Sequence, residues 1–375
     1  RANLEKLKNC LDNGEHYIVA LLLCLVLTLS LGTANASAVD VSGNDSFKSI
    51  SCNGVKEFPD GGKIYTYIIN GVVNQFPVPP DGFDPVKATD EELERYGFPP
   101  RPKARSGNEY SSWLELVGDY TGTPLPDISI REKPITDIAI TSSTKNSTAS
   151  VTSIYSSNWS GYDSNLGSSS SNFYTQVQVD YTQPTISAIS GSSSSNVIGY
   201  WVGLGGHNTQ KLVQAGTATT GLSDHWAWYE YLSASHPNPA IRINSLTISP
   251  GDSIHVYIAF EKANDKFNYY IANNTTGKSA SGIVNLDSDE YFDGTTADWI
   301  VERASTYLPN YESITMNTCK TTLNTSNTWL NIGNLTGIYK ITLTSNGASS
   351  GTVLSQPGNI SSNNTQFQCT WKAYS

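Results

Sequence analysis

The residues of this chain that could do chemistry lie in short stretches rich in tryptophan, glycine and carboxylates. In residues 226–231 the side chains of Trp226, Trp228 and Glu230 alternate with their neighbours. Successive strand residues point to opposite faces, so these three side chains share one face of a sheet. Two interpretations of that face stay open: a half-buried aromatic surface with one satisfied carboxylate, or the wall of a binding cleft.

A glutamine and a second glutamate complete the set of candidates. Gln214 stands between Val213 and Ala215, and Glu302 closes the run that begins at Trp299. A single glutamine on a strand is usually a surface residue, and a glutamate at a strand end is usually solvated or paired. Neither residue taken alone therefore indicates catalysis.

Signatures of covalent and metal-dependent hydrolases are missing from the sequence. No Gly-x-Ser-x-Gly elbow leads from a strand into a helix, and the 5 histidines contain no His-x-x-x-His pair. No Asp-Thr-Gly or Asp-Ser-Gly occurs, which argues against an aspartic protease. We expect no cofactor and no metal ion.

The informative stretches follow one another in a fixed order between residues 157 and 302. They are Asn158–Tyr162, Trp201–Gly206, Leu212–Gly216, Trp226–Tyr231, Asn274–Gly277 and Ala297–Glu302. Together they resemble the glutamic peptidases of the eqolisin family, and the resemblance covers about residues 155–375. Residues 81–102 also resemble the region upstream of the catalytic domain in non-fungal members.

The resemblance implies both a fold and a site. The implied fold is all-β: a sandwich of two antiparallel sheets of the concanavalin A-like or jelly-roll type, with a substrate cleft across one face. The implied enzyme is a secreted, acid-acting endopeptidase that is made as a zymogen and acts on proteins or peptides. The implied catalytic residues are Gln214 and Glu302, and the implied substrate-binding residues are Trp201, Trp228 and Glu230.

An amide beside one carboxylate suits peptide hydrolysis in acid. Glu302 can take a proton from water and later deliver a proton to the leaving nitrogen. Gln214 has no titratable proton, so its NH₂ group stays a donor that can hold the water and stabilise the oxyanion. This chemistry forms no covalent intermediate.

Two positions depart from the pattern of the fungal members. Those members carry aspartates where this chain has Gly205 and Ala218. In the family these side chains support the cleft, so the subsite preference and optimum pH do not follow from the resemblance. The Gln214–Glu302 pair is unaffected.

Two other function classes stay open on the residues alone. A glycoside hydrolase on a similar sandwich needs two carboxylates about 5–5.5 Å apart if retaining, or about 6.5–9.5 Å apart if inverting. Glu230 and Glu302 are the attractive pair for that reaction. A non-catalytic carbohydrate- or peptide-binding module would use the tryptophan-rich face.

The composition is that of a β-rich extracellular protein. Charged residues make up 15% of the 375 residues and the net charge is −10. Nucleic-acid binding needs a clustered basic surface, which this sequence lacks, so we expect no nucleic-acid partner. We expect a monomer.

Short strands are predicted throughout the second half of the chain. Period-two alternation occurs in residues 173–181, 197–203, 226–231, 253–260, 268–273, 299–301, 338–344 and 366–371. Turn-rich segments separate these stretches and no helical pattern intervenes, which favours a sandwich or barrel. We assign residues 146–375 to the peptidase domain.

The first 38 residues resemble an export signal. Basic residues precede an apolar run, and small residues offer cleavage after Ala36 or Ala38. The alternative is an uncleaved N-terminal anchor. With the signal removed, we expect a secreted protein without stable membrane association.

Residues 39–145 are interpreted as a mostly irregular pro-region and linker with one short helix. The helix would begin at a capping box formed by Thr89 and Glu92. Its Pro-rich arms could lie across the cleft at neutral pH, with Lys103 and Arg105 paired to carboxylates that neutralise in acid.

Cysteine usage predicts one bridge in the exported protein. Cys10 and Cys24 would leave with the signal, and Cys319 is the favoured partner of Cys369. Cys52 would then be left over, and the three remaining cysteines have no Cys-x-x-Cys spacing for zinc.

Overall fold

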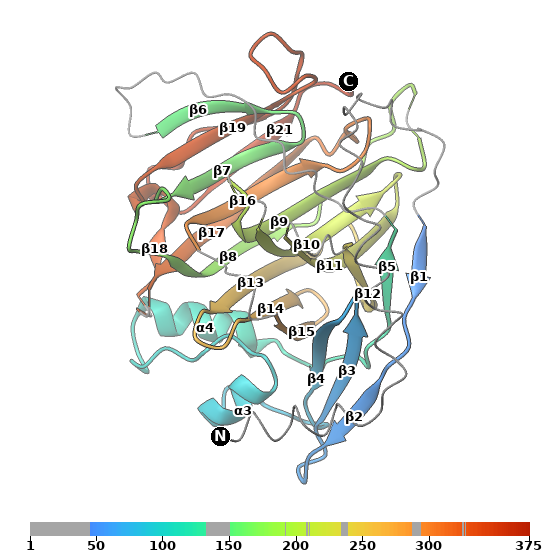
Figure 1. The fold of residues 1–375 in the computed structure, drawn as a ribbon, viewed down its shortest axis with the longest axis vertical. Helices are drawn as coiled ribbons and strands as arrows, with labels where there is room; N and C mark the ends of the chain where they lie inside the picture. Colours follow the sequence, from blue (N-terminus) through green and yellow to red (C-terminus); the bar gives the residue numbers. More distant parts are fainter. Residues whose placement is uncertain are drawn as a thin grey trace, which may run out of the picture. The chain divides into compact units, whose positions relative to one another are not determined.

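The computed structural model describes most of the chain beyond residue 45. The described residues are 46–132, 151–191, 193–207, 209, 211–233, 239–286, 294–324, 326 and 328–375. They form strands that pack as two mainly antiparallel sheets, with two α-helices at one end (Figure 1). The prediction of an all-β sandwich is confirmed. The expected signal, residues 1–38, and the end of the expected pro-region and linker, residues 133–145, lie outside the described residues.

Sheet A is the sheet that carries the candidate site. Its neighbouring strands are, in order, β1 (Phe47–Ser49), β5 (Ile128–Arg131), β12 (Ile241–Thr247), β11 (Asp224–Leu232), β10 (Leu212–Thr220), β9 (Val197–Gly205), β16 (Thr296–Arg303), β7 (Trp159–Asn165) and β19 (Ile338–Thr344). Strand β19 also pairs with β6 (Val151–Ser156), in parallel, and with β20 (Val353–Pro357), which pairs with β21 (Phe367–Trp371).

Sheet B lies against sheet A. Its neighbouring strands are, in order, β2 (Gly54–Glu57), β3 (Lys63–Ile69), β4 (Val72–Val78), β15 (Lys278–Asn285), β14 (Lys266–Asn273), β13 (Ser253–Glu261), β8 (Tyr174–Thr182), β17 (Ser313–Leu323) and β18 (Leu330–Asn331), after which a 3-10 turn covers Ile332–Asn334. Strand β17 joins the sheets, because its first half pairs with β21 and its second half with β8.

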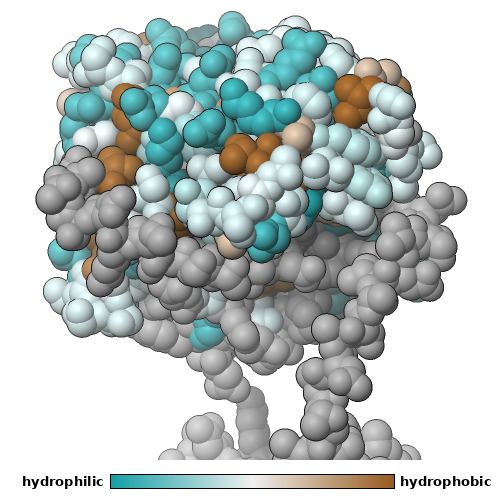
Figure 2. Space-filling model, turned by 90° about the horizontal axis from the view of Figure 1, so that it is seen from above, coloured by the Kyte–Doolittle hydropathy of each residue, from teal (hydrophilic) through white to brown (hydrophobic). Residues whose placement is uncertain are grey.

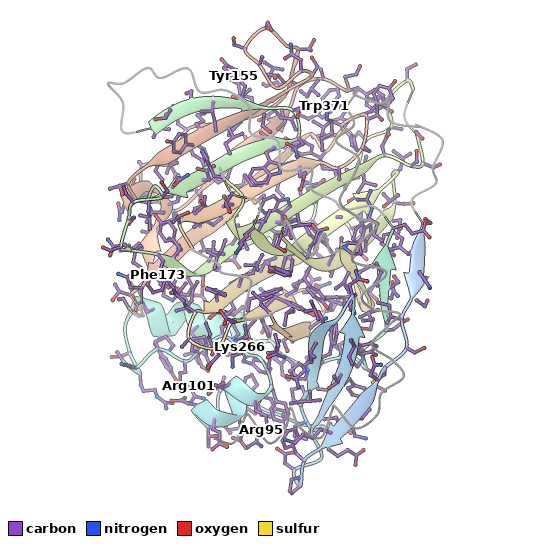
Figure 3. The ribbon with its side chains drawn as sticks, viewed as in Figure 1. Arg95, Arg101, Tyr155, Phe173, Lys266 and Trp371 are labelled. Carbon is purple, nitrogen blue, oxygen red and sulfur yellow. The ribbon has the colours of Figure 1, made fainter. Side chains whose placement is uncertain are left out.

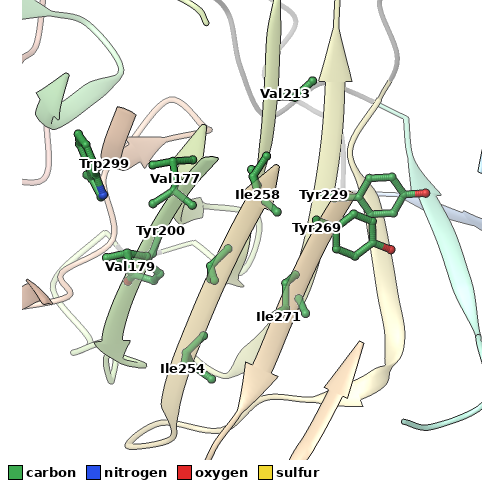
Figure 4. Close-up of a cluster of buried hydrophobic side chains, with 14 of the residues drawn as sticks. Val177, Val179, Tyr200, Val213, Tyr229, Ile254, Ile258, Tyr269, Ile271 and Trp299 are labelled. Carbon is green, nitrogen blue, oxygen red and sulfur yellow. The ribbon is translucent and has the colours of Figure 1, made fainter. Parts of the chain in front are cut away.

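The main core fills the space between the two sheets. Period-two alternation places Tyr200 and Tyr229 of sheet A opposite Ile258 and Tyr269 of sheet B (Figure 4). The rings of Tyr229 and Tyr269 stack with their centroids 4.3 Å apart. Burying each such side chain contributes about 1.5–3 kcal/mol, so this layer holds the sheets together.

Figure 2 shows one outer face of the molecule as mainly hydrophilic, with small separated apolar spots.

Residues 46–132 are far more ordered than the sequence predicts. The capping box at helix α3 (Asp90–Arg95) is confirmed, since Thr89 Oγ1 accepts a hydrogen bond from the Glu92 N–H at 3.1 Å. A second helix, α4 (Asn108–Gly118), and strands β1 to β5 were not predicted. Short strands of this kind form because the edges of the two sheets give them partners, which local sequence cannot show.

One buried arginine organises the turn that leads into helix α3. The side chain of Arg101, beside α3 in Figure 3, is 3% exposed. Its guanidinium donates to the carbonyl oxygens of Pro85, Val86 and Ala88 and lies over the ring of Trp113 at 5.0 Å. A planar guanidinium with five N–H donors can satisfy several carbonyls at once, which fixes this turn.

The predicted placement of the Pro-rich arms is wrong. Residues 76–78 belong to β4, which pairs with β15 of sheet B. Pro99, Pro100 and Pro102 line a cavity of about 230 Å³ together with His255 of sheet B. The arms therefore pack on sheet B, and the candidate site lies on sheet A.

The predicted Cys319–Cys369 bridge is also absent, because both residues are free and buried. Strand register explains the difference: Cys369 pairs with Ile314, five residues before Cys319 on the same strand. Burial raises the pKa of the Cys369 thiol to about 12. Cys52 is free and exposed.

Candidate active site

The candidate residues lie on the face of sheet A that points away from sheet B. In β10, Val213 and Ala215 enter the core between the sheets, so Gln214 points to the opposite face. A second apolar cluster covers this face and includes Trp201 and Trp228. The tryptophans of the alternating pattern are therefore not part of the inter-sheet core, although Trp226 and Trp228 are at most 1% exposed.

Gln214 is held by Glu230 of the neighbouring strand. The two residues are directly paired in the β10–β11 register. The Gln214 Nε2 group donates to Glu230 Oε2 at 2.5 Å, and neither residue has exposed surface. A carboxylate oxygen can only accept here, so the contact turns the amide nitrogen of Gln214 toward Glu230.

Glu302 is surrounded by N–H donors. Its Oε2 accepts from Trp201 Nε1 at 2.8 Å, and its Oε1 accepts from Trp159 Nε1 at 3.2 Å and Asn158 Nδ2 at 3.3 Å. Indole N–H groups donate and never accept, so two of these contacts require an oxygen acceptor. The donors replace water around a carboxyl group that is 0% exposed.

Strand β9 lies between the two candidate catalytic residues. Gln214 pairs with Gly203 of β9, and Glu302 pairs with Gly199 on its other edge. Directly paired strand residues share a face, and Gly199 and Gly203 share one by period two, so both side chains project from the same face. Trp201 stands between them on β9 and donates to Glu302.

Glycines make room for the Trp201 indole. A Cβ atom on Gly216 would lie 2.0 Å from the carbonyl oxygen of Tyr200 and 2.8 Å from Trp201 Cα. A Cβ atom on Gly203 would meet the Trp201 ring at 3.0 Å. The Gln-x-Gly spacing is thus required by the close approach of β10 to β9, and the Trp-x-Gly spacing by the packing of the Trp201 ring.

The remaining tryptophans line the same face. The rings of Trp159 and Trp201 meet edge to face at 5.1 Å. Trp228 is fully buried, and its Nε1 has no hydrogen-bond partner among the described residues. Trp228 is therefore placed as predicted, on the face that carries Gln214 and Glu302.

A buried acidic pair lies on this face and was missed by the sequence reasoning. Asp298 of β16 is directly opposite Asp163 of β7, and both are 0% exposed. Asp163 Oδ2 contacts His207 Nδ1 at 2.6 Å, whereas neither oxygen of Asp298 has a partner among the described residues. Asp298 and Glu302 stand four residues apart in one strand motif, so they share a face. This spacing was the signal that could have identified Asp298 from the sequence.

Burial controls the protonation of this acidic pair. Burial, followed by the charge of Asp163, raises the pKa of Asp298 well above its ordinary value. Burial also raises the pKa of Asp163, against the opposing charge of His207. For His207, burial acts to lower the pKa, but the charge of Asp163 and its hydrogen bond together raise it.

The two departures from the fungal pattern are both in or beside this face. Ala218 pairs with Gly199, which in turn pairs with Glu302, so the missing aspartate would have stood in the row of Glu302. Ala218 instead packs into the apolar cluster of that face.

Within the described part of the chain, no group of three His, Cys, Asp or Glu side chains could hold a metal ion.

Comparison with known families assigns the chain. A family model described as the Peptidase A4 family matches residues 157–371. The chain belongs to this family, and the resemblance inferred from the ordered motifs is confirmed. Aspergillopepsin-2 of Aspergillus niger is 31% identical over an alignment of 169 residues, and the match covers 40% of this chain and 56% of that relative.

Solved structures of similar proteins extend the comparison. A scytalido-glutamic peptidase with a peptide-based transition state analog is 18% identical, covers 58% of this chain and 98% of its own, and has a TM-score of 0.47. SCP-B, an eqolisin in a complex with the tripeptide Ala-Ile-His, is also 18% identical over the same shares, with a TM-score of 0.44.

Proposed function

We propose that this chain is a secreted, acid-acting endopeptidase that uses Gln214, Glu302 and one water molecule. The observation that carries the proposal is the placement of the amide and the carboxyl on one face of sheet A, on either side of β9. Membership of a peptidase family gives the reaction class. Peptides are the substrates, in line with the peptide ligands of the two similar structures.

The reaction needs a base, an oxyanion donor and an acid. Glu302 takes a proton from the water, which attacks the peptide carbonyl carbon. The Gln214 amide donates to the oxyanion, and Glu302 then delivers the proton to the leaving nitrogen. Glu230 positions Gln214 through the 2.5 Å contact. Trp201 and Trp228 supply the apolar surface against which the substrate packs.

Access of substrate requires a change from this form of the chain. Gln214, Glu230 and Glu302 have no exposed surface. A peptide reaches them only after part of the chain has moved, so this form of the chain is latent. Among the described residues, no helix is long and apolar enough to span a membrane.

The test is cleavage of casein or a labelled peptide by the secreted protein at pH 2–5, with and without pepstatin. We expect pepstatin-resistant cleavage that Gln214→Ala lowers about 10²–10³-fold and Glu302→Ala abolishes. Full activity in either variant would overturn the assignment.

The same variants, assayed on sugar as well as peptide substrates, separate the glycoside hydrolase alternative. A hydrolase that used Glu230 and Glu302 would lose all activity in Glu230→Gln and little in Gln214→Ala. The peptidase predicts the reverse ranking, because Glu230 acts only through Gln214. Binding of peptide or sugar without turnover by the acid-treated protein would instead favour a binding module.

A further inference from the structure

The segment expected to be a removable pro-region has the contacts of a permanent part of the sandwich. We propose that residues 46–131, called here the N-terminal module, stay bound when the chain is cut beyond residue 132, and that they complete the substrate-binding face. The module lies outside the residues matched by the family model.

The module extends both sheets at once. Strand β5 pairs with β12 of sheet A through Ile128, Ser129 and Ile130. Two backbone bonds flank these pairs, from Arg131 N to Ala240 O at 2.9 Å and from Asn244 N to Asp127 O at 2.8 Å. Removal of β5 would leave β12 as an unpaired edge, which promotes aggregation.

At sheet B the module supplies strand β4. Its residues Val73, Asn74 and Gln75 pair with the last residues of β15. A segment that dissociates would therefore expose a second edge, on the other sheet. Two edges in two sheets would have to open together for the module to leave.

Side chains of the module enter the core between the sheets. Phe76 is 3% exposed and meets the ring of Tyr229 at 5.9 Å. Tyr229 also donates its hydroxyl to Asn74 Oδ1 at 2.8 Å, and both residues are buried. Loss of the module would leave a buried hydroxyl of β11, the strand that carries Glu230, without this acceptor.

The helical part of the module covers the outer face of sheet B. Phe98 and Trp113 form one apolar cluster with Tyr257 and Tyr270 of that sheet. The fit is close at Gly97, where the backbone has φ +71° and an added Cβ would lie 2.8 Å from Ser281 Oγ. The same serine donates to Tyr96 O at 2.8 Å.

The module also reaches the candidate active site. The ring of Phe47 on β1 meets the ring of Trp226 edge to face at 5.1 Å. Arg131 at the end of β5 is 4% exposed, and its Nη2 donates at 3.4 Å to the carbonyl of Ala304, two residues beyond Glu302. Phe47 and Arg131 therefore border the face on which the substrate would lie.

The experiment cuts the connection and asks whether the pieces separate. A recognition sequence for a site-specific protease is inserted into the full chain between residues 141 and 150, in Glu302→Gln protein to prevent self-digestion. After the cut, size-exclusion chromatography and native mass spectrometry are run at pH 3.5 and pH 7. We expect both pieces to stay together at the position of the uncut chain.

A matched pair of variants tests which contacts hold the module. Phe76→Ala should weaken the association of the cut pieces about 100-fold or more, because a buried ring is lost. Ile68→Ala, at a site that is 52% exposed on the neighbouring strand, should leave it unchanged. Circular dichroism before the cut confirms that each variant has folded.

Departure of the N-terminal piece, with residues 151–375 still folded and monodisperse, would overturn the proposal. The association does not depend on the proposed peptidase function. The peptidase function is measured separately, as peptide cleavage by cut protein that has Glu302 in place. If the two pieces co-elute but no peptide is cleaved, the proposed peptidase function is contradicted and the proposed association is not.

Discussion

Two carboxylic acids on one strand of this protein have opposite surroundings. Glu302 and Asp298 lie four residues apart on β16 and on the same face, and both are 0% exposed. Glu302 accepts three hydrogen bonds from neutral N–H donors. Asp298 has no hydrogen-bond partner in the part of the chain that the structure describes, and another aspartate lies opposite it.

The difference shows that burial alone does not determine what a carboxyl group can do. Donors replace the lost water at Glu302, so the site can bear negative charge while a proton moves. At Asp298 the pKa is raised well above the ordinary value by burial and by Asp163, so this group keeps its proton in acid. The first environment suits proton transfer, and the second ties the stability of the fold to pH.

The largest expected effect is on catalytic activity, which should distinguish Glu302 from Asp298. Glu302→Gln should lower kcat/KM at pH 4 by about 10²–10⁴-fold, the usual contribution of a general acid–base. Asp298→Asn, a matched change at the other acid, should stay within about 3-fold, because a neutral group replaces a neutral one.

Peptide hydrolysis by the two folded variants, after acid activation, makes the measurement. Asp298 is in the same cross-strand row as Gln214, since both pair with Gly203. A loss in Asp298→Asn as large as that in Glu302→Gln would therefore move the acting carboxyl from Glu302 to Asp298.

The sequence was sufficient for the local part of this site. Alternation in residues 226–231 placed Trp228 and Glu230 on one face, and the structure puts them there. The resemblance carried by the ordered motifs also singled out Gln214 and Glu302, which share that face. Both the strand period and the order of the motifs can be read directly along the chain, so a single sequence is enough to show them.

Register between distant strands could not be read from the sequence. Asp163 and Asp298 meet because β7 pairs with β16, and nothing within either strand specifies that pairing. The same holds for β5, a four-residue strand that exists because β12 offers it an edge. The predicted cysteine bridge failed for this reason too, since composition says nothing of how β17 and β21 align.

A second prediction concerns stability and pH. The native state holds a proton on Asp298 that the unfolded chain releases above its ordinary pKa of 3.8. The free energy of unfolding should therefore fall as pH rises from about 4 toward the raised pKa, by about 1.4 kcal/mol for each tenfold gain in proton affinity on folding. His207 adds to this trend, because its raised pKa gives stability that is lost as pH rises above about 6.5.

Asp298→Asn should remove the first part of this dependence. Its melting temperature should exceed that of the unmodified protein by several degrees at pH 7, with little difference at pH 3. Calorimetry at both pH values makes the comparison, and Asp81→Asn, at an exposed surface carboxylate, is the control. Equal melting temperatures for the Asp298 variant and the unmodified protein at pH 7 would contradict the buried, protonated state of Asp298.

The smallest expected effect tests the donors that distinguish Glu302. Trp201→Phe keeps most of the ring and removes the 2.8 Å N–H bond to Oε2. A hydrogen bond to a charged group contributes about 1.5–3 kcal/mol, so kcat should fall about 10–100-fold. Trp159→Phe removes a longer bond of 3.2 Å and should cost less.

Trp228→Phe is the matched control for this series, because the Nε1 of Trp228 has no partner among the described residues. Its kcat should stay within about 3-fold, and any change should be in KM, as expected of a side chain that packs against substrate. Peptide kinetics at pH 4 rank the three variants. Equal losses of kcat in all three would mean that the indoles act by packing alone, and the contrast between Glu302 and Asp298 would then not rest on their donors.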